Sequence, residues 1–243
     1  WISDFLFSLF RISIFGFRIY IRSWRCRVQT LMIHDWKREY FALPLADYRL
    51  TFDDGLFSQY YYQPLLADQP GGLTFFIATA LIRPGPCRPR FDGRHLEHLD
   101  SGAYSRRAHI ERRLDDFMTV DEVRFLAEQP GVRIGAHSHF HDVILTDVHP
   151  RKPKRPSAWK LERFRDVPET LRRGLSIRSR LAFQGFDHRD GALVPRPEAR
   201  WRDDIRRDTE LCLEWFRRHL GRIPESYCFP FNEYSPTLLD ILR

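Results

Sequence analysis

Residues 73–82 constrain the fold most, because their sequence, LTFFIATALI, is a nearly unbroken apolar run of residues that favour strands. A strand covered on one face alternates apolar and polar residues, and this run shows no such alternation. It predicts a strand that is covered on both faces, which is typical of parallel sheets flanked by helices.

The segments on either side of this run repeat an order of strand and helix. Residues 48–54 alternate apolar and polar, which predicts a half-buried strand, and residues 58–68 follow with helical spacing. Farther along, Thr119 and Glu122 form a capping-box pair that starts a helix, and a short strand is expected at 132–138. Strand, helix and strand in this order imply parallel pairing with right-handed crossovers. The predicted fold class is α/β.

The C-terminal third divides into an irregular part and a regular part. Residues 142–200 are basic and contain proline without a clear period, so we expect a long basic insertion. Regular structure returns with an amphipathic helix at 203–221, a strand at 225–231 and a helix capped by Ser235.

The first 31 residues are apolar, but Asp4, Arg11, Arg18 and Arg22 interrupt them. A membrane-spanning helix needs about 20 nearly uncharged residues, and a signal peptide places its charges before the apolar run. Two interpretations stand: residues 1–31 precede the natural start at Met32, or they form a basic amphipathic segment on a membrane surface. We therefore divide the chain into an extension at 1–31 and a domain at 32–243.

The formal net charge of +7 indicates an affinity for anions such as nucleic acid, a membrane surface or an anionic sugar. The chain lacks a helix-turn-helix, zinc-finger or RNA-binding signature, so we expect no nucleic-acid partner. The 4 cysteines are scattered without a C-x-x-C pair, which favours reduced thiols and a cytoplasmic protein with candidate membrane association.

Polar motifs mark the ends of three predicted strands: TFDDG at 51–55, HSHFH at 137–141 and FPF at 229–231. The carboxyl ends of strands form the active face of parallel α/β folds. Two His and one carboxylate are a common ligand set for a catalytic divalent metal, usually zinc. His137 and His141, four residues apart, are a weak signal by themselves, since solvated His clusters are frequent. Alternatively, Asp53 and Asp54 have no catalytic role and only cap the turn that follows the strand.

Taken together and in this order, the three motifs resemble the polysaccharide deacetylase family, which removes N-acetyl groups from amino sugars. The resemblance extends over residues 47–141 and 203–243. It implies a distorted (β/α) barrel that is incomplete at the C-terminal side of this chain.

The resemblance also implies a role for each matching residue. Asp54, His137 and His141 would bind the divalent metal, most often Zn²⁺, and Asp53 would be the catalytic base. The backbone N–H of Phe231 would help to hold the oxyanion. On this interpretation the bend at Gly55 separates the two acids, so that one serves the metal and the other is free for proton transfer.

Neighbouring motif positions are expected to support these residues. Thr51 and Ser138 match positions that would hydrogen-bond to the ligands. His139 would either contact the metal ligands without binding the metal itself, or face solvent.

Three positions depart from the family pattern. Cys228 stands where an Arg often orients the catalytic carboxylate, and Asn232 stands where Gly is common. The family's late His, which protonates the leaving amine, has no counterpart after the third motif, because His219 precedes it. We therefore expect the general acid to lie beyond residue 243.

These observations predict a metal-dependent N-deacetylase of an amino-sugar glycan or glycan precursor. The alternatives are removal of a formyl or other acyl group from an amino sugar, and a non-catalytic glycan-binding protein. The insertion at 142–200 would recognise an anionic part of the substrate, with Trp159 and Trp201 as sugar-stacking platforms. Its basic residues include Arg151, Lys152, Lys154 and Arg155. Alternatively, it is a solvated loop whose Trp residues pack in the core.

Overall fold

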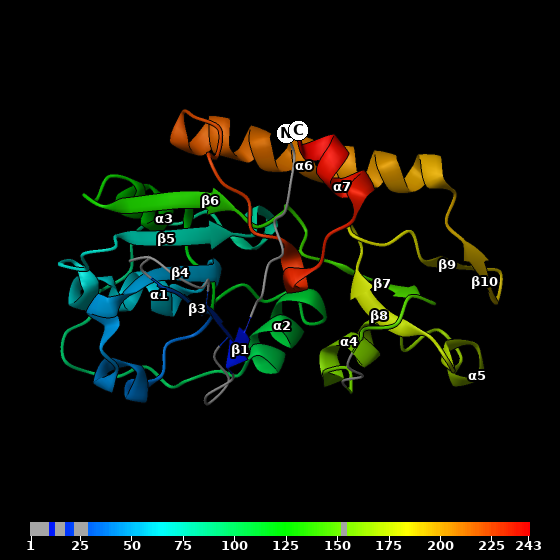
Figure 1. The fold of residues 1–243 in the computed structure, drawn as a ribbon, viewed down its shortest axis with the longest axis horizontal. Coiled ribbons are helices and arrows are strands. Elements are labelled where there is room, and N and C mark those ends of the chain that lie inside the picture. Colours follow the sequence, from blue (N-terminus) through cyan, green and yellow to red (C-terminus); the bar gives the residue numbers. More distant parts are fainter. Residues whose placement is uncertain (1–9, 13–17, 22–28, 152–154) are drawn as a thin grey trace.

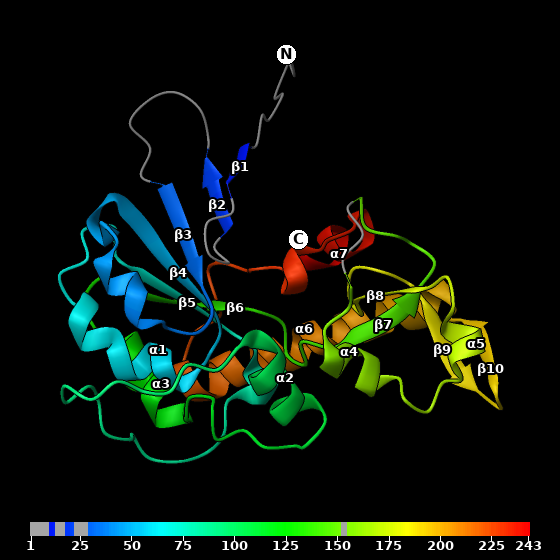
Figure 2. The same ribbon diagram turned by 90° about the horizontal axis from the view of Figure 1, so that it is seen from below.

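The computed structural model describes residues 10–12, 18–21, 29–151 and 155–243, which form two sheets joined by a long helix (Figure 1). The strand order is β1-β2-β3-β4-β5-β6 in the central sheet and β10-β9-β7-β8 in the second sheet. Helix α6 (Glu198–Leu220) runs along both sheets, across the top of Figure 1. Figure 2 shows α1 and α3 on the same face of the central sheet.

The elements have the following bounds. The central sheet contains β1 (Phe10–Ile12), β2 (Arg18–Ile21), β3 (Gln29–Ile33), β4 (Tyr48–Asp54), β5 (Leu73–Ile77) and β6 (Val132–Ala136). The second sheet contains β7 (Val143–Thr146), β8 (Ser176–Ser179), β9 (Phe186–Arg189) and β10 (Ala192–Pro195). The other helices are α1 (Phe57–Tyr62), α2 (Ser101–His109), α3 (Val120–Ala127), α4 (Ala158–Arg163), α5 (Glu169–Arg172) and α7 (Pro236–Leu242). Short 3-10 helices include η4 (Thr79–Leu81) and η5 (Pro230–Asn232).

The central sheet confirms the predicted α/β class with a parallel sheet. Strands β3 to β6 are parallel, and Leu50 of β4 lies opposite Leu31 of β3 and Leu73 of β5. Strand β4 is buried from Leu50 to Asp54, so the predicted half-buried strand is wrong, because β4 lies in the middle of a sheet covered on both faces. Among the described residues, β1 and β6 are not paired with each other, and the sheet is open.

The core of the central sheet is aromatic. The rings of Phe52 and Phe75, on neighbouring strands, stack with centroids 4.8 Å apart, and both side chains are fully buried. Three consecutive tyrosines of α1 (60–62) and Phe216 of α6 belong to the same cluster. Burying one such ring is worth about 1.5–3 kcal/mol, so this cluster holds β4 and β5 in place beneath the polar motifs.

The predicted helix ends are confirmed at two places. The Glu122 N–H donates to Thr119 Oγ1 (3.2 Å), and the Thr119 N–H donates to Glu122 Oε2 (2.8 Å), which completes the capping box of α3. The Leu238 N–H donates to the Ser235 hydroxyl (3.2 Å) at the start of α7.

The strand predicted at 225–231 is wrong. Tyr227 forms one isolated parallel bridge to Ala136 of β6, and the chain then turns into η5. Extended structure ends there because Phe231 and Asn232 have φ values of 58° and 59°, in the left-handed region.

The predicted extension at 1–31 overlaps the sheet. Its described parts form strands β1 and β2 and the first three residues of β3, and no helix lies in these parts. Leu31 is buried and pairs with Leu50, so the predicted boundary at residue 32 falls within β3. The remainder of the predicted extension lies outside the described residues.

No helix in the described part of the chain is both long enough and apolar enough to cross a membrane.

Residues 142–200 are not a structureless loop, because they contain the four strands of the second sheet. Strand β7 begins two residues after the HSHFH motif, and α4 lies against α2 (Figure 2). Trp201 packs among Leu181, Ile205 and Leu238, and its indole N–H donates to the Leu181 carbonyl (3.0 Å). The expected sugar platform at Trp201 is therefore wrong, because its ring is part of a core.

Candidate metal centre

The polar motifs meet at the carboxyl ends of neighbouring parallel strands. Asp53 and Asp54 end β4, and His137 follows β6 directly. His141 closes the next turn, in which its N–H donates to the Ser138 hydroxyl (3.1 Å). This is the edge of a parallel sheet where side chains from separate strands converge.

Three ligand-type atoms converge on one point. Asp54 Oδ1 lies 3.4 Å from Nε2 of His137 and 3.3 Å from Nε2 of His141. All three side chains are buried, and Asp54 Oδ1 has no hydrogen-bond partner. Ligand atoms about 2.0–2.1 Å from a tetrahedral Zn²⁺ lie about 3.3–3.4 Å from one another. The spacing and the unpaired oxygen therefore fit a small divalent cation.

The tautomer of His137 follows from its other contact. Its Nδ1 lies 2.9 Å from the backbone carbonyl oxygen of Cys228, which can only accept, so Nδ1 carries the proton. In the neutral imidazole the lone pair on Nε2 is then directed toward Asp54, as a metal ligand requires. A backbone contact of this kind fixes both the ring orientation and the tautomer.

A second grouping of possible ligands, Asp53, His137 and Cys228, shares one imidazole with the first. Burial raises the pKa of the Cys228 thiol, so this sulfur is protonated at neutral pH. The first grouping needs no thiol to lose its proton, and its unpaired Asp54 Oδ1 lies 3.3 and 3.4 Å from two imidazole nitrogens, so it suits a cation better.

The two adjacent acids point in different directions because the backbone reverses between them. Asp54 has φ 75° and Gly55 has φ 86°, so the predicted bend at Gly55 begins one residue earlier. Asp54 faces the imidazoles, whereas Asp53 Oδ2 lies 3.5 Å from the sulfur of Cys228, whose S–H donates. A Cβ at Gly55 would lie 2.8 Å from Cδ1 of Ile82, so a side chain there would be crowded as well as strained.

The pKa values of the two acids shift in opposite directions. Burial raises the pKa of Asp53, which the imidazoles of His137 and His34 only partly oppose. Burial also acts on Asp54, but the imidazoles of His141, His137 and His34 outweigh it and hold the pKa of Asp54 below its usual range. Asp54 is therefore suited to be an ionised ligand, and Asp53 is suited to exchange a proton.

The turn that carries the two candidate His ligands is strained. Ser138 and His141 have φ values of 69° and 52°, and a left-handed conformation costs a non-glycine residue about 1–2 kcal/mol. Backbone N–H groups of Thr79 and Ala80 in η4 donate to the carbonyls of Ser138 (3.2 Å) and His139 (3.0 Å). Neighbouring elements thus hold this turn in a conformation that it would not adopt alone.

Sequence reasoning missed two residues at this site. The Tyr104 hydroxyl donates to Asp54 Oδ2 (2.9 Å), and His34 Nε2 lies 4.0 Å from the same oxygen. Tyr104 belongs to α2, which was not predicted, although Asp100 caps it through two backbone N–H groups and could have indicated it. His34 follows β3, which was not predicted because the chain was expected to start at Met32, within this strand.

We expect Tyr104→Phe to weaken metal binding by about 10–100-fold, the usual cost of losing a partner that orients a ligand. The hydroxyl fixes Asp54 Oδ2 and so directs Oδ1 toward the imidazoles. Metal titration by calorimetry would measure the change, and Tyr234→Phe, at an exposed tyrosine, is the matched control. Wild-type affinity in Tyr104→Phe would contradict this role.

Comparison with known proteins gives a likeness in structure. No protein-family model and no curated sequence matches the chain. The BpsB deacetylase domain from Bordetella bronchiseptica superposes with a TM-score of 0.51 at 19% identity, over 80% of this chain and 59% of that one. A de-N-acetylase from Aggregatibacter actinomycetemcomitans superposes with a TM-score of 0.50 at 14% identity, over 80% of this chain and 58% of that one. The chain shares its fold with these two deacetylases.

This likeness concerns the fold and confirms the resemblance at that level. The chain spans 59% and 58% of the two deacetylase chains, less than two thirds of their length.

Residues of α4 and η5 lie beside the candidate metal centre. The ring of Phe231 lies 4.5 Å from that of His141, and Lys160 Nζ lies 3.9 Å above the Phe231 ring. Trp159 is buried and stacks on His109 at 4.9 Å. Residues of α4 therefore form one wall of the site, with the Trp159 ring packed against an imidazole.

Two departures from the family pattern have structural counterparts in the deacetylase fold. The Cys228 thiol takes the place beside Asp53 where an Arg was expected, and it brings no positive charge. Asn232, at the position where Gly is common, has φ 59°, a conformation that Asn tolerates better than most residues.

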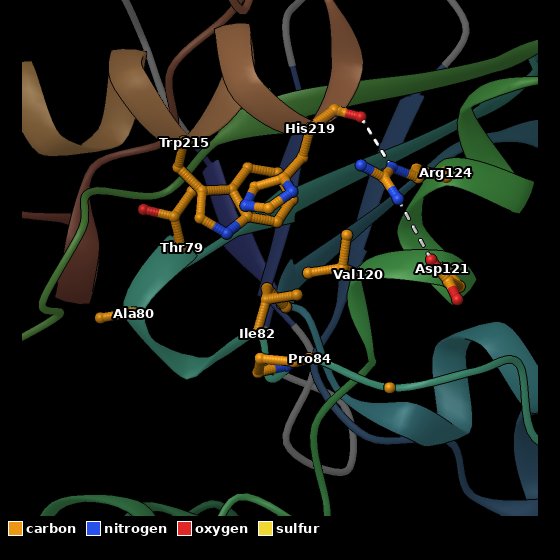
Figure 3. Close-up of a pocket in the computed structure, with 10 residues that line it drawn as sticks. Thr79, Ala80, Ile82, Pro84, Val120, Asp121, Arg124, Trp215 and His219 are labelled. Atoms are coloured by element: carbon orange, nitrogen blue, oxygen red, sulfur yellow. Dashed lines mark hydrogen bonds and ion pairs between the residues drawn. The ribbon is translucent and has the colours of Figure 1, made fainter.

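His219 lies at a separate pocket of about 410 Å³ (Figure 3). His219 lies on α6, and the centroid of its ring is 4.8 Å from that of Trp215. Its backbone carbonyl accepts from Arg124 Nε (3.0 Å). None of the three ligand candidates lines this pocket. His188 is exposed on β9 in the second sheet. Neither imidazole is placed to act as the acid of the metal centre.

Proposed function

We propose that the protein is a metal-dependent N-deacetylase, a hydrolase of amide bonds in an amino-sugar glycan or glycan precursor. The observation that carries this proposal is the buried, unpaired Asp54 Oδ1 at 3.3 and 3.4 Å from two imidazole nitrogens. The fold shared with two deacetylases supports the same activity.

Asp54, His137 and His141 would hold the metal, and two imidazoles with one carboxylate suit Zn²⁺. When bound, a divalent cation supplies Lewis-acid chemistry, because it polarises a carbonyl and lowers the pKa of water. The low pKa of Asp54 keeps this ligand ionised, and the Cys228 carbonyl keeps His137 in the tautomer that can bind.

Asp53 would act as the general base. Its Oδ1 is buried without a hydrogen-bond partner, and its raised pKa favours acceptance of a proton from the attacking water. The backbone N–H of Phe231 would donate to the oxyanion that develops on the amide oxygen. The contact between the Phe231 and His141 rings supports this, since it sets the residue beside a proposed ligand.

His34 would protonate the leaving amine. Its side chain is 41% exposed, and its Nε2 lies 4.0 Å from Asp54 Oδ2, so it is open to solvent at the edge of the centre. The carbonyl of His34 accepts from the Gln59 amide (2.8 Å), which ties it to α1. This proposal differs from the expectation that the general acid lies beyond residue 243.

We expect His34→Asn to lower kcat by about 10²-fold, the lower end for a general acid, because water can reach this exposed site and replace the imidazole in part. Metal affinity should fall less than in Tyr104→Phe, since Nε2 of His34 lies 4.0 Å from Asp54 Oδ2, too far for a hydrogen bond. His188→Asn, at an exposed imidazole of the second sheet, is the control. A wild-type kcat in His34→Asn would show that His34 is not the general acid. The expectation from the sequence, an acid beyond residue 243, would then stand again.

We further propose that the substrate carries an anionic part, which basic residues of 142–200 bind. Arg151, Arg155 and Arg165 are exposed in this region. Screening weakens such contacts, since the Debye length falls from about 30 Å at 0.01 M salt to about 8 Å at 0.15 M. We expect KM for an anionic amino-sugar oligomer to rise with salt while KM for its neutral counterpart stays constant; equal behaviour of both would contradict the proposal.

The barrel and the cytoplasmic location stay predictions. We propose that the open central sheet and the bridge at Tyr227 belong to an incomplete (β/α) barrel, since that bridge adds a parallel neighbour to β6. A solved structure that includes any flanking sequence would reveal whether the sheet closes.

Release of amines from a panel of sugars would test the proposed activity. The panel would contain N-acetylated and N-formylated amino-sugar oligomers, with an acetylated lysine peptide as the non-sugar amide. We expect amine release from the N-acetylated sugars. Release from the formylated sugars alone would favour the deformylase alternative, and binding without any release would favour the glycan-binding alternative.

A further inference from the structure

Asp208 of α6 is a buried carboxylate whose hydrogen bonds go to the turn between the two His ligands. Its Oδ1 accepts from the His139 N–H and its Oδ2 from the Phe140 N–H, both at 2.9 Å. The side chain is 2% exposed, and among the described residues no basic side chain forms an ion pair with it. Burying a carboxylate is costly unless hydrogen bonds satisfy it, and these two backbone donors do so.

The two donors belong to the turn that the metal centre depends on. His139 and Phe140 lie between His137 and His141, in the turn with left-handed residues at Ser138 and His141. On its other side this turn is held by η4, where Thr79 Oγ1 and His139 Nδ1 lie 2.8 Å apart. The strained turn is thus held between η4 and α6, and Asp208 provides the contact from α6.

We propose that Asp208 is a positioning residue of the metal centre, which holds the turn so that the His137 and His141 imidazoles keep their spacing. This inference rests on the proposed metal-dependent function. Asp208 acts through the backbone and touches neither ligand side chain.

The chemistry of the site requires a carboxylate rather than an amide. Two N–H donors point at two oxygens, and an Asn side chain has only one acceptor, so its NH₂ group would oppose one of the donors. Burial raises the pKa of Asp208 to about 6, with the charge of Asp142 adding to the effect, so the group is mainly ionised at neutral pH. Two further titratable groups that interact with it, Cys212 and Tyr227, are neutral there, since burial raises both pKa values.

Asp208→Asn and Asp203→Asn form a matched pair for the test. Asp203 lies on the same helix, 73% exposed, and pairs with Arg206. For Asp208→Asn we expect Zn²⁺ and Co²⁺ to bind about 10–100-fold more weakly than to wild type. The visible spectrum of the Co²⁺ form should change, because the ligands shift. Asp203→Asn should retain wild-type affinity and spectrum.

The outcomes separate this inference from the proposed function. If the wild-type protein binds neither metal, the proposed function fails and the role of Asp208 fails with it. If the wild type binds metal and Asp208→Asn binds it equally well with an unchanged spectrum, only the Asp208 inference is overturned. A lower melting temperature with unchanged affinity counts against it in the same way, since it indicates a merely structural role.

A second measurement needs no variant and applies if Asp208→Asn does not fold. Amide hydrogen exchange in the wild-type protein reports directly on the His139 and Phe140 N–H groups. We expect both amides to exchange as slowly as the protected backbone amides of α6. Exchange at the rate of an open loop would overturn the proposal.

Discussion

Asp54→Ala is expected to abolish metal binding and, with it, turnover. The substitution removes one of the three proposed ligands, the carboxylate whose Oδ1 lies 3.3 and 3.4 Å from the two imidazole nitrogens. Loss of an outer partner typically lowers metal affinity about 10–100-fold, so loss of a ligand should lower it by more than about 100-fold. Calorimetric titration of the metal-free protein with Zn²⁺ would measure the change.

The control for Asp54→Ala is the neighbouring acid. Asp53→Asn removes a charge one residue away but keeps the proposed ligand set, so it should still bind the metal. If Asp54→Ala bound Zn²⁺ as tightly as wild type, the proposed ligand set would be incorrect.

Asp53→Asn is expected to retain the metal and lose most of the rate. An amide oxygen cannot take up the proton from the attacking water, and removal of a general base costs about 10²–10⁴ in rate. This corresponds to about 3–5 kcal/mol in the activation free energy. The fold should be retained, because the Asn carbonyl oxygen can still accept the S–H of Cys228.

Comparing kcat and Zn²⁺ affinity for the two variants assigns the roles of the two acids. If Asp53→Asn lost the metal and Asp54→Ala kept it, the roles would be exchanged. If neither substitution changed either quantity, the metal-hydrolase account would fail.

The part of the site that could be predicted lies at strand ends. An apolar run followed by TFDDG, and a short strand followed by HSHFH, are local patterns, and parallel pairing brings their ends to one edge of the sheet. The parallel sheet and the meeting of the acid pair with His137 and His141 could be predicted for this reason, whereas the choice of Asp54 as a ligand came from the family resemblance.

The missed residues depend on contacts that are distant in the sequence. Tyr104 reaches Asp54 across 50 positions, and Asp208 reaches His139 across 69. In the sequence Asp208 resembles the other acids of its helix, such as Asp203 and Asp204. Only the packing of α6 against the turn distinguishes it.

The second sheet was missed because its strands lack a clear period. Strands β8, β9 and β10 are four residues each, and most of their side chains are half-buried or exposed. A short strand with so little burial has no alternation strong enough to separate it from loop. The false strand at 225–231 has the opposite cause, since its apolar residues favour a strand while the left-handed φ of Phe231 ends extended structure.

Acetate release before and after metal removal tests the central claim most directly. The purified protein would be incubated with N-acetylated amino-sugar oligomers as prepared, after treatment with a chelator, and after restoration of Zn²⁺. We expect acetate release to stop when the metal is removed and to return when Zn²⁺ is restored. Release that continues in the metal-free protein, or no release from any N-acetylated sugar in the Zn²⁺-loaded protein, would contradict a metal-dependent deacetylase.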